Sequence, residues 1–477
     1  MADAPAENAQ QGGGKTSKYA PQVVAALVAT LGGFSLGTVI GWNAPASYPI
    51  AQMFYDGDMK KAEYILGWTG SIMPLGACTA MVLMALIVDR IGRKVVMLGL
   101  AFPFILSWLI LAFWAAIPAL LIGRFLSGLC GGSFCVVAPI YIGEIAQKEI
   151  RGTLGVFFQL LLVIGILYSF ALGLLRRLDF LSYMNIIPNV LFIILMIFMP
   201  ESPMYLLGKE KKDAAKVSLQ WFRGKNTNID AELEEMEESV RASKERKGTL
   251  KDMFKQKASK KATATSLLLM FCQQLSGINI VMFYATDIFR DAKTGLNEDL
   301  STVILGLSQV FATVVAAVLI DRVGRRILLI ISHAGMGVCL AVLGVYFHMK
   351  EREMEAAANI GWLAVLCTCV YLLSFSLGSG PIPWAMLGEL FPAEIKGIAG
   401  SFCSFVNWML AFVVTKTFYD IRNAINSDGC YWLYAAFCFT GTVLIFFFVI
   451  ETKNKTLEEI QREFGGGTAG GETEAAG

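Results

Sequence analysis

The sequence predicts an all-α polytopic membrane protein with twelve transmembrane helices in two six-helix halves. Three observations lead to this prediction. Of the 477 residues, 55% are hydrophobic and only 16% are charged, whereas soluble domains average roughly 25% charged residues. Apolar windows of about 20 residues, each long enough to cross a bilayer, recur along the chain. Two short loop motifs also repeat in the same order in the two halves of the chain.

Twelve apolar spans follow one another, with one long polar interruption between the sixth and the seventh. They begin near residues 21, 64, 95, 119, 153, 181, 264, 299, 327, 361, 398 and 431. Within the interruption, "KEKKDAAKVSL" and "DAELEEMEESV" have the pattern of short amphipathic helices. We therefore divide the chain into a flexible tail (1–20), a first half (21–200), a linker (201–262), a second half (263–450) and a carboxyl-terminal tail (451–477).

Basic residues gather in the short loops on one side of the predicted bundle. "DRIGRK" (89–94), Lys148 with Arg151, "DRVGRR" (321–326) and the linker all fall on that side. Because such loops stay in the cytoplasm, we expect a multi-pass plasma-membrane protein whose termini and linker are cytoplasmic. The net charge of +2 gives no indication of a nucleic-acid partner.

The loop motifs form an internal repeat. "IVDRIGRK" recurs as "LIDRVGRR", with Asp89 and Asp321 standing 232 residues apart. "GEIAQKEIRG" recurs as "GELFPAEIKG", with Glu144 and Glu389 standing 245 residues apart. Such duplicated bundles are typical of transporters whose substrate site lies near the midplane, between the halves.

The repeated charges predict ion-pair clusters at the cytoplasmic ends of the helices. Glu144 and Arg151, and likewise Glu389 and Lys396, stand seven residues apart, the spacing of two helical turns. We hypothesise that these clusters hold the halves together when the pore faces outward; the alternative is that the positive loops only fix orientation. The residues expected in the clusters are Asp89, Arg90, Arg93, Glu144, Arg151, Glu201, Asp321, Arg322, Arg325, Glu389 and Lys396.

Three amide side chains interrupt the apolar run of the seventh span, in "FCQQLSGIN". Gln273 and Gln274 lie side by side on a helix, but Asn279 is about 240° from Gln273 at the helical rotation of about 100° per residue. Only a kink or an unwound turn at Gly277 brings Asn279 to the glutamines. Amides both donate and accept hydrogen bonds, which suits an uncharged ligand rich in hydroxyl groups. The alternative is that they join neighbouring helices.

Other spans carry polar or amphipathic residues at mid-span. Tryptophan offers a flat apolar face to the C–H surface of a sugar ring and an N–H to donate, although packing explains any single tryptophan equally well. The sequence shows no metal-ligating cluster, nucleotide motif or nucleophile constellation, so we expect no enzyme, no metal and no cofactor. The mid-span residues are Gln159, Gln309, Trp384, Asn407 and Trp408.

Seven motifs in this order resemble those of the sugar porters of the major facilitator superfamily, from about residue 20 to 462. They are "DRIGRK", "GRFLSG", "PESPMYL", "QQLSGIN", "DRVGRR", "GPIPW" and "ETKNKTLEEI". Within that family the chain is most similar to the insect trehalose and hexose facilitators. The resemblance implies the major facilitator fold, a neutral sugar as substrate, alternating access and a functional monomer in the lipid bilayer.

The resemblance also implies which residues form the site. Phe283 and Tyr284 match the family's aromatic outer gate. Two departures leave the sugar open, because Gln309 stands where Asn is common and Ser376 where an acidic residue is frequent. The family's sugar-contacting positions match Gln159, Gln273, Gln274, Asn279, Trp384, Asn407 and Trp408.

Val39 bears on whether transport is coupled to protons. Proton-linked relatives carry Asp at this position of the first span, and an ionisable residue inside a span is the usual candidate for a proton relay. No carboxylate lies inside the first six spans, and His333 and His348 are expected near span ends. We therefore expect facilitated diffusion, with a proton-coupled sugar symporter and a sugar-sensing receptor as the alternatives.

Overall fold

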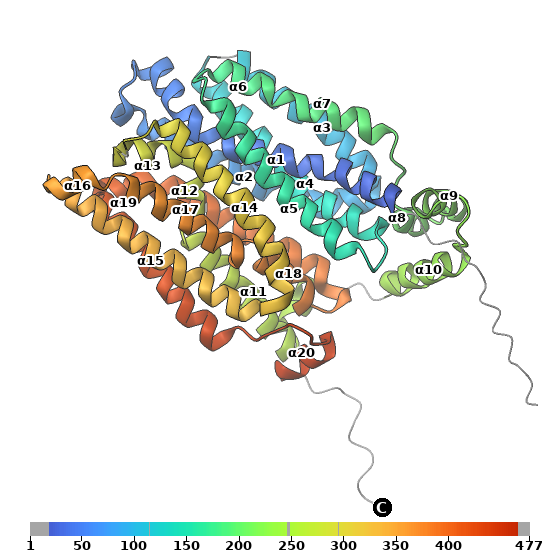
Figure 1. Ribbon diagram of the computed structural model, residues 1–477. Coiled ribbons are helices and arrows are strands. Elements are labelled where there is room, and N and C mark those ends of the chain that lie inside the picture. Colours follow the sequence, from blue (N-terminus) through green and yellow to red (C-terminus); the bar gives the residue numbers. More distant parts are fainter. Residues whose placement is uncertain (1–18, 114, 246–248, 294, 466–477) are drawn as a thin grey trace, which may run out of the picture.

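The computed structural model describes residues 19–113, 115–245, 249–293 and 295–465. Almost all of the tail predicted for residues 1–20 therefore lies outside the described residues. Long helices run side by side through the bundle, and the short helices α8, α9 and α10 lie beyond one of its ends (Figure 1). We call this the linker end and the opposite end, where α6, α13 and α16 lie, the far end.

Six membrane-crossing segments make up the first half. The Asp58 side chain accepts a hydrogen bond from the Lys61 backbone and caps the second helix. Gly92, at φ 112°, ends that helix and starts the third one at once. The sixth segment consists of two short helices that meet at Asn185. The helices are α1 (Ala20–Tyr55), α2 (Met59–Ile91), α3 (Arg93–Phe113), α4 (Ile117–Ile145), α5 (Arg151–Gly173), α6 (Leu178–Met184) and α7 (Ile186–Ile197).

The linker contains the two amphipathic helices that the sequence predicts. Leu219 of α9 and Leu233 of α10 are buried in one small apolar cluster, while charged side chains face outward. The prediction of short helices between the halves is thus confirmed. The elements are α8 (Pro203–Gly208), α9 (Lys212–Arg223), α10 (Asp230–Glu245) and the 3₁₀ turn η1 (Leu250–Phe254).

The second half repeats the pattern with more interruptions. Its seventh span breaks at Gly277, and its tenth span breaks between Leu377 and Ile382. The elements are α11 (Lys257–Leu275), α12 (Ile278–Phe283), α13 (Ala285–Ala292), α14 (Glu298–Val323), α15 (Arg325–Glu351), α16 (Glu355–Asn359), α17 (Trp362–Leu377), α18 (Ile382–Leu390), α19 (Ala393–Phe448) and α20 (Leu457–Glu463).

Eleven helical segments of the described chain are long and apolar enough to cross a membrane. The last of them, Glu394–Phe448, is far longer than one crossing requires. Within it, Ile425 and Asn426 leave helical geometry, with Asn426 at φ 61°, so that two helices meet there at a kink. With this division the structure has the twelve spans that the sequence predicts.

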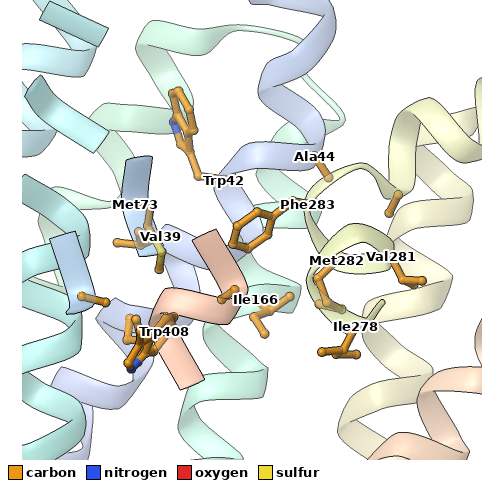
Figure 2. Close-up of a cluster of buried hydrophobic side chains, with 14 of the residues drawn as sticks. Val39, Trp42, Ala44, Met73, Ile166, Ile278, Val281, Met282, Phe283 and Trp408 are labelled. Carbon is orange, nitrogen blue, oxygen red and sulfur yellow. The ribbon is translucent and has the colours of Figure 1, made fainter. Parts of the chain in front are cut away.

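The two halves meet along several pairs of helices, among them α1 with α12 and α13. α5 packs against α14, and α2 packs against α19. In the middle of the bundle, apolar side chains of both halves form one buried cluster (Figure 2). It contains Val39 and Trp42 of α1 together with Phe283 of α12 and Trp408 of α19. The break at Gly277 and the middle of α19 therefore lie against the first half.

Candidate functional site

The seventh span is broken where the amides require it. α11 ends at Leu275, Gly277 adopts the left-handed conformation with φ 85° and ψ 15°, and α12 begins at Ile278. Only glycine adopts this conformation readily. A Cβ atom at Gly277 would also lie 3.2 Å from Cγ of Tyr434. The predicted break is confirmed, and it turns Asn279 back toward the glutamines.

Three buried amides and the half-buried Asn279 form a continuous chain of hydrogen bonds. Asn279 Nδ2 donates to Gln274 Oε1 at 2.5 Å, and Gln274 Nε2 donates to Asn407 Oδ1 at 2.9 Å. Asn407 Nδ2 donates to Gln273 Oε1 at 2.8 Å. Gln273 Nε2 in turn donates to the carbonyl oxygens of Ser379 and Gly380, at 2.7 and 3.1 Å. The structure thus brings together four of the eight predicted substrate-binding residues, from α11, α12 and α19.

The other four predicted substrate-binding residues make no hydrogen bond to this chain in the described part of the protein. Gln159 on α5 and Trp384 on α18 are half-buried. Gln309 on α14 and Trp408 on α19 are buried, and Gln309 Oε1 and Trp408 Nε1 find no hydrogen-bond partner among the described residues. An unpartnered acceptor and an unpartnered donor are the groups that a polyhydroxylated ligand satisfies.

Phe283 and Tyr284, the predicted gate residues, are buried where α12 meets α13. Tyr284 stacks on Phe418 with ring centroids 4.9 Å apart, and its hydroxyl donates to the Thr415 carbonyl at 3.2 Å. The carbonyl oxygen of Phe283 accepts from Asn43 Nδ2 of the first half at 3.0 Å. The aromatic pair is therefore held against both halves.

Polar bonds between the halves continue toward the far end. Ser47 of α1 donates to the buried carboxylate of Asp287 on α13 at 2.8 Å. Arg176, just after α5, reaches Asp299 at 2.5 Å and Glu298 at 2.7 Å. The sequence analysis did not anticipate these contacts, because each joins residues more than 120 positions apart.

A further ion pair joins α19 to α2 at the far end. Arg422 reaches Glu63 of the first half at 2.5 Å and Asp291 of its own half at 3.2 Å. Both Arg422 and Glu63 are mostly buried. We call the residues that join the halves here the far-end latch: Asn43, Ser47, Glu63, Arg176, Phe283, Asp287, Glu298, Asp299 and Arg422.

At the linker end, the predicted charge clusters form within each half. In the first half Arg93 binds Glu144 at 2.8 Å and Asp89 at 2.9 Å, while Glu201 accepts from the backbone N–H groups of Arg93 and Lys94. Among the described residues no ion pair joins the two halves at this end. Among the described residues, therefore, ion pairs join the halves at the far end and not at the linker end.

The second half has the same arrangement. Arg325 binds Glu389 at 3.2 Å, and Glu451 accepts from the backbone N–H groups of Arg325 and Arg326 at 2.9 and 3.0 Å. The sequence analysis missed Glu451, although it stands 250 residues after Glu201, an offset close to those of the other repeated motifs.

Several predicted cluster residues do not join these clusters. α4 ends at Ile145 and α18 ends at Leu390, so Arg151 and Lys396 belong to the following helices, and the expected two-turn helical spacing is wrong. These two side chains are exposed, as are those of Arg90 and Arg322, and the described residues offer these four no carboxylate within salt-bridge distance. The side chain of Asp321 lies outside the described part of the protein.

Arg124 is a buried cation that the sequence analysis missed. Its Nη1 donates to the Val39 carbonyl oxygen at 2.8 Å, its Nε donates to the Thr69 carbonyl oxygen at 3.2 Å, and its guanidinium lies over the Trp42 ring. Nη2 has no partner among the described residues. The position that carries Asp in proton-linked relatives thus contacts this arginine through its backbone only.

His333 is also placed differently from the prediction. It was expected near a span end, but α15 begins at Arg325, so His333 lies more than two turns inside the helix and is fully buried. His348 lies near the other end of α15, as expected, where its Nδ1 is 2.7 Å from Asp428.

Comparisons with known proteins identify the family. The family model described as "Sugar (and other) transporter" matches residues 25–464. The facilitated trehalose transporter Tret1 of Drosophila mojavensis is 38% identical over 447 residues, which are 93% of this chain and 51% of that protein. The chain therefore spans about half the length of this relative. Tret1 of Bombyx mori is 38% identical over 94% of this chain and 87% of that protein.

Solved structures show the same fold. The xylose transporter XylE from E. coli, in a partially occluded inward open conformation, matches with a TM-score of 0.78 at 24% identity, over 92% of this chain and all of that one. The proton:xylose symporter XylE bound to 6-bromo-6-deoxy-D-glucose matches with a TM-score of 0.75 at 25% identity, over 94% of this chain and 100% of that one. The chain belongs to the sugar transporter family and has the major facilitator fold.

Proposed function

We propose that this protein is a facilitative transporter that carries a neutral sugar, trehalose or a hexose such as glucose, across the plasma membrane by alternating access. It acts as a transporter and not as an enzyme. The observation that carries the proposal is the amide chain from Asn279 to Gln273, which lies beside the breaks of the seventh and tenth spans in the second half. Amides inside a membrane protein either join neighbouring helices or line a polar pathway, and a position beside two helix breaks favours the pathway.

The chemistry of the site favours an uncharged, polyhydroxylated substrate. The amide chain contains donors and acceptors but no carboxylate and no cation. The unpartnered groups of Gln309 and Trp408 add one acceptor and one donor, and the indole ring adds an apolar face for a sugar ring. The 38% identity with facilitated trehalose transporters supports trehalose as the first sugar to test.

The polar contacts support alternating access. The far-end latch joins the halves, whereas the described linker-end charges bond only within each half. We assign this arrangement to the state that is closed outside, with both termini and the linker in the cytoplasm. Opening to the outside then requires the latch to break, and the linker-end charges are available to join the halves instead.

The proposal that sugar transport is not coupled to protons rests on the surroundings of Arg124. The Val39 side chain offers this arginine no carboxylate, and only the backbone carbonyl at that position contacts the guanidinium. A proton relay needs a group that gains and loses a proton near the site. Without one at this position, the sugar moves down its own gradient.

Uptake into proteoliposomes tests the proposal. Labelled trehalose and glucose are supplied to vesicles with and without an inwardly directed proton gradient. We expect saturable uptake of at least one sugar that stops at equilibrium and is not driven further by the proton gradient. Accumulation above equilibrium under the gradient would establish symport instead. Binding without any uptake would favour a receptor.

A further inference from the structure

We propose that Ser332 and His333, which lie outside the amide chain, fix the direction of its hydrogen bonds and thereby determine which hydroxyl groups of the sugar the site recognises. The inference rests on the proposed function, since it assigns positioning residues to the same site. It follows from the way the chain is anchored.

The direction of the chain is set at one end. The oxygens of Ser379 and Gly380 are backbone carbonyls, which only accept hydrogen bonds, so Gln273 must turn its nitrogen toward them. The Oε1 atom of Gln273 then faces Asn407, which must donate a hydrogen bond to it from Nδ2. The same constraint passes to the remaining two amides. Reversing any one amide would place two donors or two acceptors face to face.

The anchor lies in irregular backbone. Ser379 and Gly380 stand between the end of α17 at Leu377 and the start of α18 at Ile382. Gly378 lets this segment approach α15 closely, because a Cβ atom there would lie 2.4 Å from the Leu328 carbonyl oxygen. A segment outside regular helix keeps its orientation only through bonds to its neighbours.

Besides the bond from the Gly380 backbone N–H to the Phe375 carbonyl oxygen, two adjacent residues of α15 supply bonds to Ser379. The Ser379 backbone N–H donates to Ser332 Oγ at 3.0 Å, and Ser379 Oγ lies 3.4 Å from His333 Nε2. All three residues are fully buried. With its N–H and its hydroxyl both held by α15, Ser379 turns its carbonyl toward α11 and Gln273.

The tautomer of His333 lets its ring accept a hydrogen bond from the Ser379 hydroxyl. Its Nδ1 lies 3.1 Å from the Leu329 carbonyl oxygen, which only accepts, so Nδ1 carries the proton. In the neutral ring Nε2 is then an acceptor, and the Ser379 hydroxyl donates to it. His333 thus fixes the hydroxyl of Ser379 and contributes to the orientation of the whole segment.

The experiment measures hydroxyl recognition in proteoliposomes. Its readout is the ratio of Vmax/KM for the transported sugar to that for analogues in which one hydroxyl is replaced by fluorine, which accepts but does not donate. In Ser332→Ala and His333→Phe the Ser379 carbonyl loses a contact that turns it toward Gln273, so Gln273 and the amides after it can reverse. We therefore expect the preference for hydroxyl over fluorine to fall about two- to tenfold at one or more ring positions, the effect of one net hydrogen bond.

Two further variants serve as controls. Ser107→Ala removes a buried hydroxyl that bonds only to a carbonyl of its own helix, and it should keep the wild-type ratio. His333→Gln retains an acceptor for the Ser379 hydroxyl and should restore the ratio that His333→Phe loses. If His333→Phe does not fold, Ser379→Ala removes the same contact while keeping the backbone carbonyl, and the same fall in preference is expected.

Two outcomes would count against the inference in different ways. Variants that lose transport rate while the hydroxyl-to-fluorine ratio stays unchanged would show a purely structural role and overturn it. A wild type that transports neither trehalose nor glucose would contradict the proposed function first, and the inference would fail with it.

Discussion

Asn407 is the residue on which the amide chain depends most, because it contacts both glutamines. Its Oδ1 accepts from Gln274 and its Nδ2 donates to Gln273. On sequence grounds it was one of several mid-span polar residues, and nothing in its immediate neighbours sets it apart. Its importance comes from the contact between α19 and α11, which are distant in sequence.

The Asn407→Ala variant is expected to lose at least tenfold in sugar uptake while remaining folded. The substitution leaves Gln273 Oε1 and Gln274 Nε2 without their partner, at a cost of about 1–3 kcal/mol for each unsatisfied buried group. Uptake in proteoliposomes and thermal unfolding in detergent measure the two effects. Asn189→Ala is the control, because Asn189 is equally buried but its amide bonds only to a carbonyl of the preceding turn. Equal uptake losses in both variants would argue against a site role for Asn407.

At the scale of elements, the break at Gly277 decides whether the seventh span forms a site. Two short helices with a left-handed residue between them expose side chains that one straight helix would point in different directions. The tenth span is broken in a similar way. The carbonyl oxygens of Ser379 and Gly380, which lie in that break, accept hydrogen bonds from Gln273. The site is therefore built where two helices of the second half are interrupted.

Gly277→Ala is expected to destabilise the protein by about 1–2 kcal/mol, because a side chain in left-handed geometry is strained by that amount. The added Cβ would also press on Tyr434. The rate of sugar uptake should fall further than the loss of folded protein explains, since Asn279 moves away from Gln274. Thermal unfolding and uptake are compared with Gly99→Ala, where a Cβ atom meets nothing within 4 Å. The proposed role of the break is wrong if both variants transport like the wild type.

Glu451 holds the start of α15 through its carboxylate. Burial raises the pKa of this group, but backbone N–H groups of Lys453, Arg325, Arg326 and Thr452 donate to it and hold its pKa below the ordinary value of 4.5. A carboxylate whose pKa is lowered by folding stabilises the folded state above its unfolded pKa, and this contribution is lost as the pH falls through the lowered value.

Glu451→Gln should therefore be less stable than the wild type at neutral pH, by about 1 kcal/mol, the usual size of such helix-end effects. The difference should begin to shrink near the unfolded value of 4.5 and disappear once the pH has fallen through the lowered value of the folded state, where the wild-type carboxylate becomes protonated. Thermal unfolding in detergent between neutral and acidic pH measures it. Glu458→Gln, an exposed residue of α20, should show no comparable pH-dependent difference. A stability difference for Glu451→Gln that persists unchanged into acid would show that the carboxylate charge is unimportant.

At the scale of the whole molecule, the described ion pairs between the halves all lie at the far end. The far-end latch combines bonds to backbone, to hydroxyl groups and between charges, and it surrounds the gate residues Phe283 and Tyr284. Since the two halves also share an apolar cluster (Figure 2), rocking about that cluster can exchange bonds at one end for bonds at the other. The latch then sets the balance between the two states.

Arg422→Gln is expected to shift the protein toward the state that is open at the far end. The substitution removes the pairs with Glu63 and Asp291, each worth about 1.5–3 kcal/mol when a charged group is hydrogen-bonded. One such loss changes the equilibrium by roughly tenfold to a hundredfold. Spin labels at the exposed positions Tyr64 and Met354, in a background without native cysteines, report the distance between the halves.

The control for this experiment is Arg177→Gln. Arg177 lies at the same end, but it pairs only with Asp179 of its own half in the described structure. The distance between the labels should lengthen in Arg422→Gln and stay unchanged in Arg177→Gln. An unchanged distance distribution in both variants would mean that Arg422 does not help to close the far end.

The sequence by itself determined the features that depend on local pattern. Hydrophobic windows predicted the twelve spans, the repeated loops predicted the two halves, and the angular arithmetic indicated that Asn279 joins the glutamines only if the helix breaks at Gly277. The predicted eleventh and twelfth spans form one element, α19, and the cause is again local, because a kink at Asn426 connects them. These features follow from residues within one or two turns of each other.

Only the tertiary structure decided which polar groups meet. Arg151 and Lys396 fell outside the charge clusters because helices ended before them, whereas Glu451 and the far-end latch came from residues far apart in the sequence. The order of the amide chain was likewise set by carbonyls in another broken helix. A hydrogen bond requires a partner within about 3 Å and in a suitable direction, and only the packing of the helices supplies both.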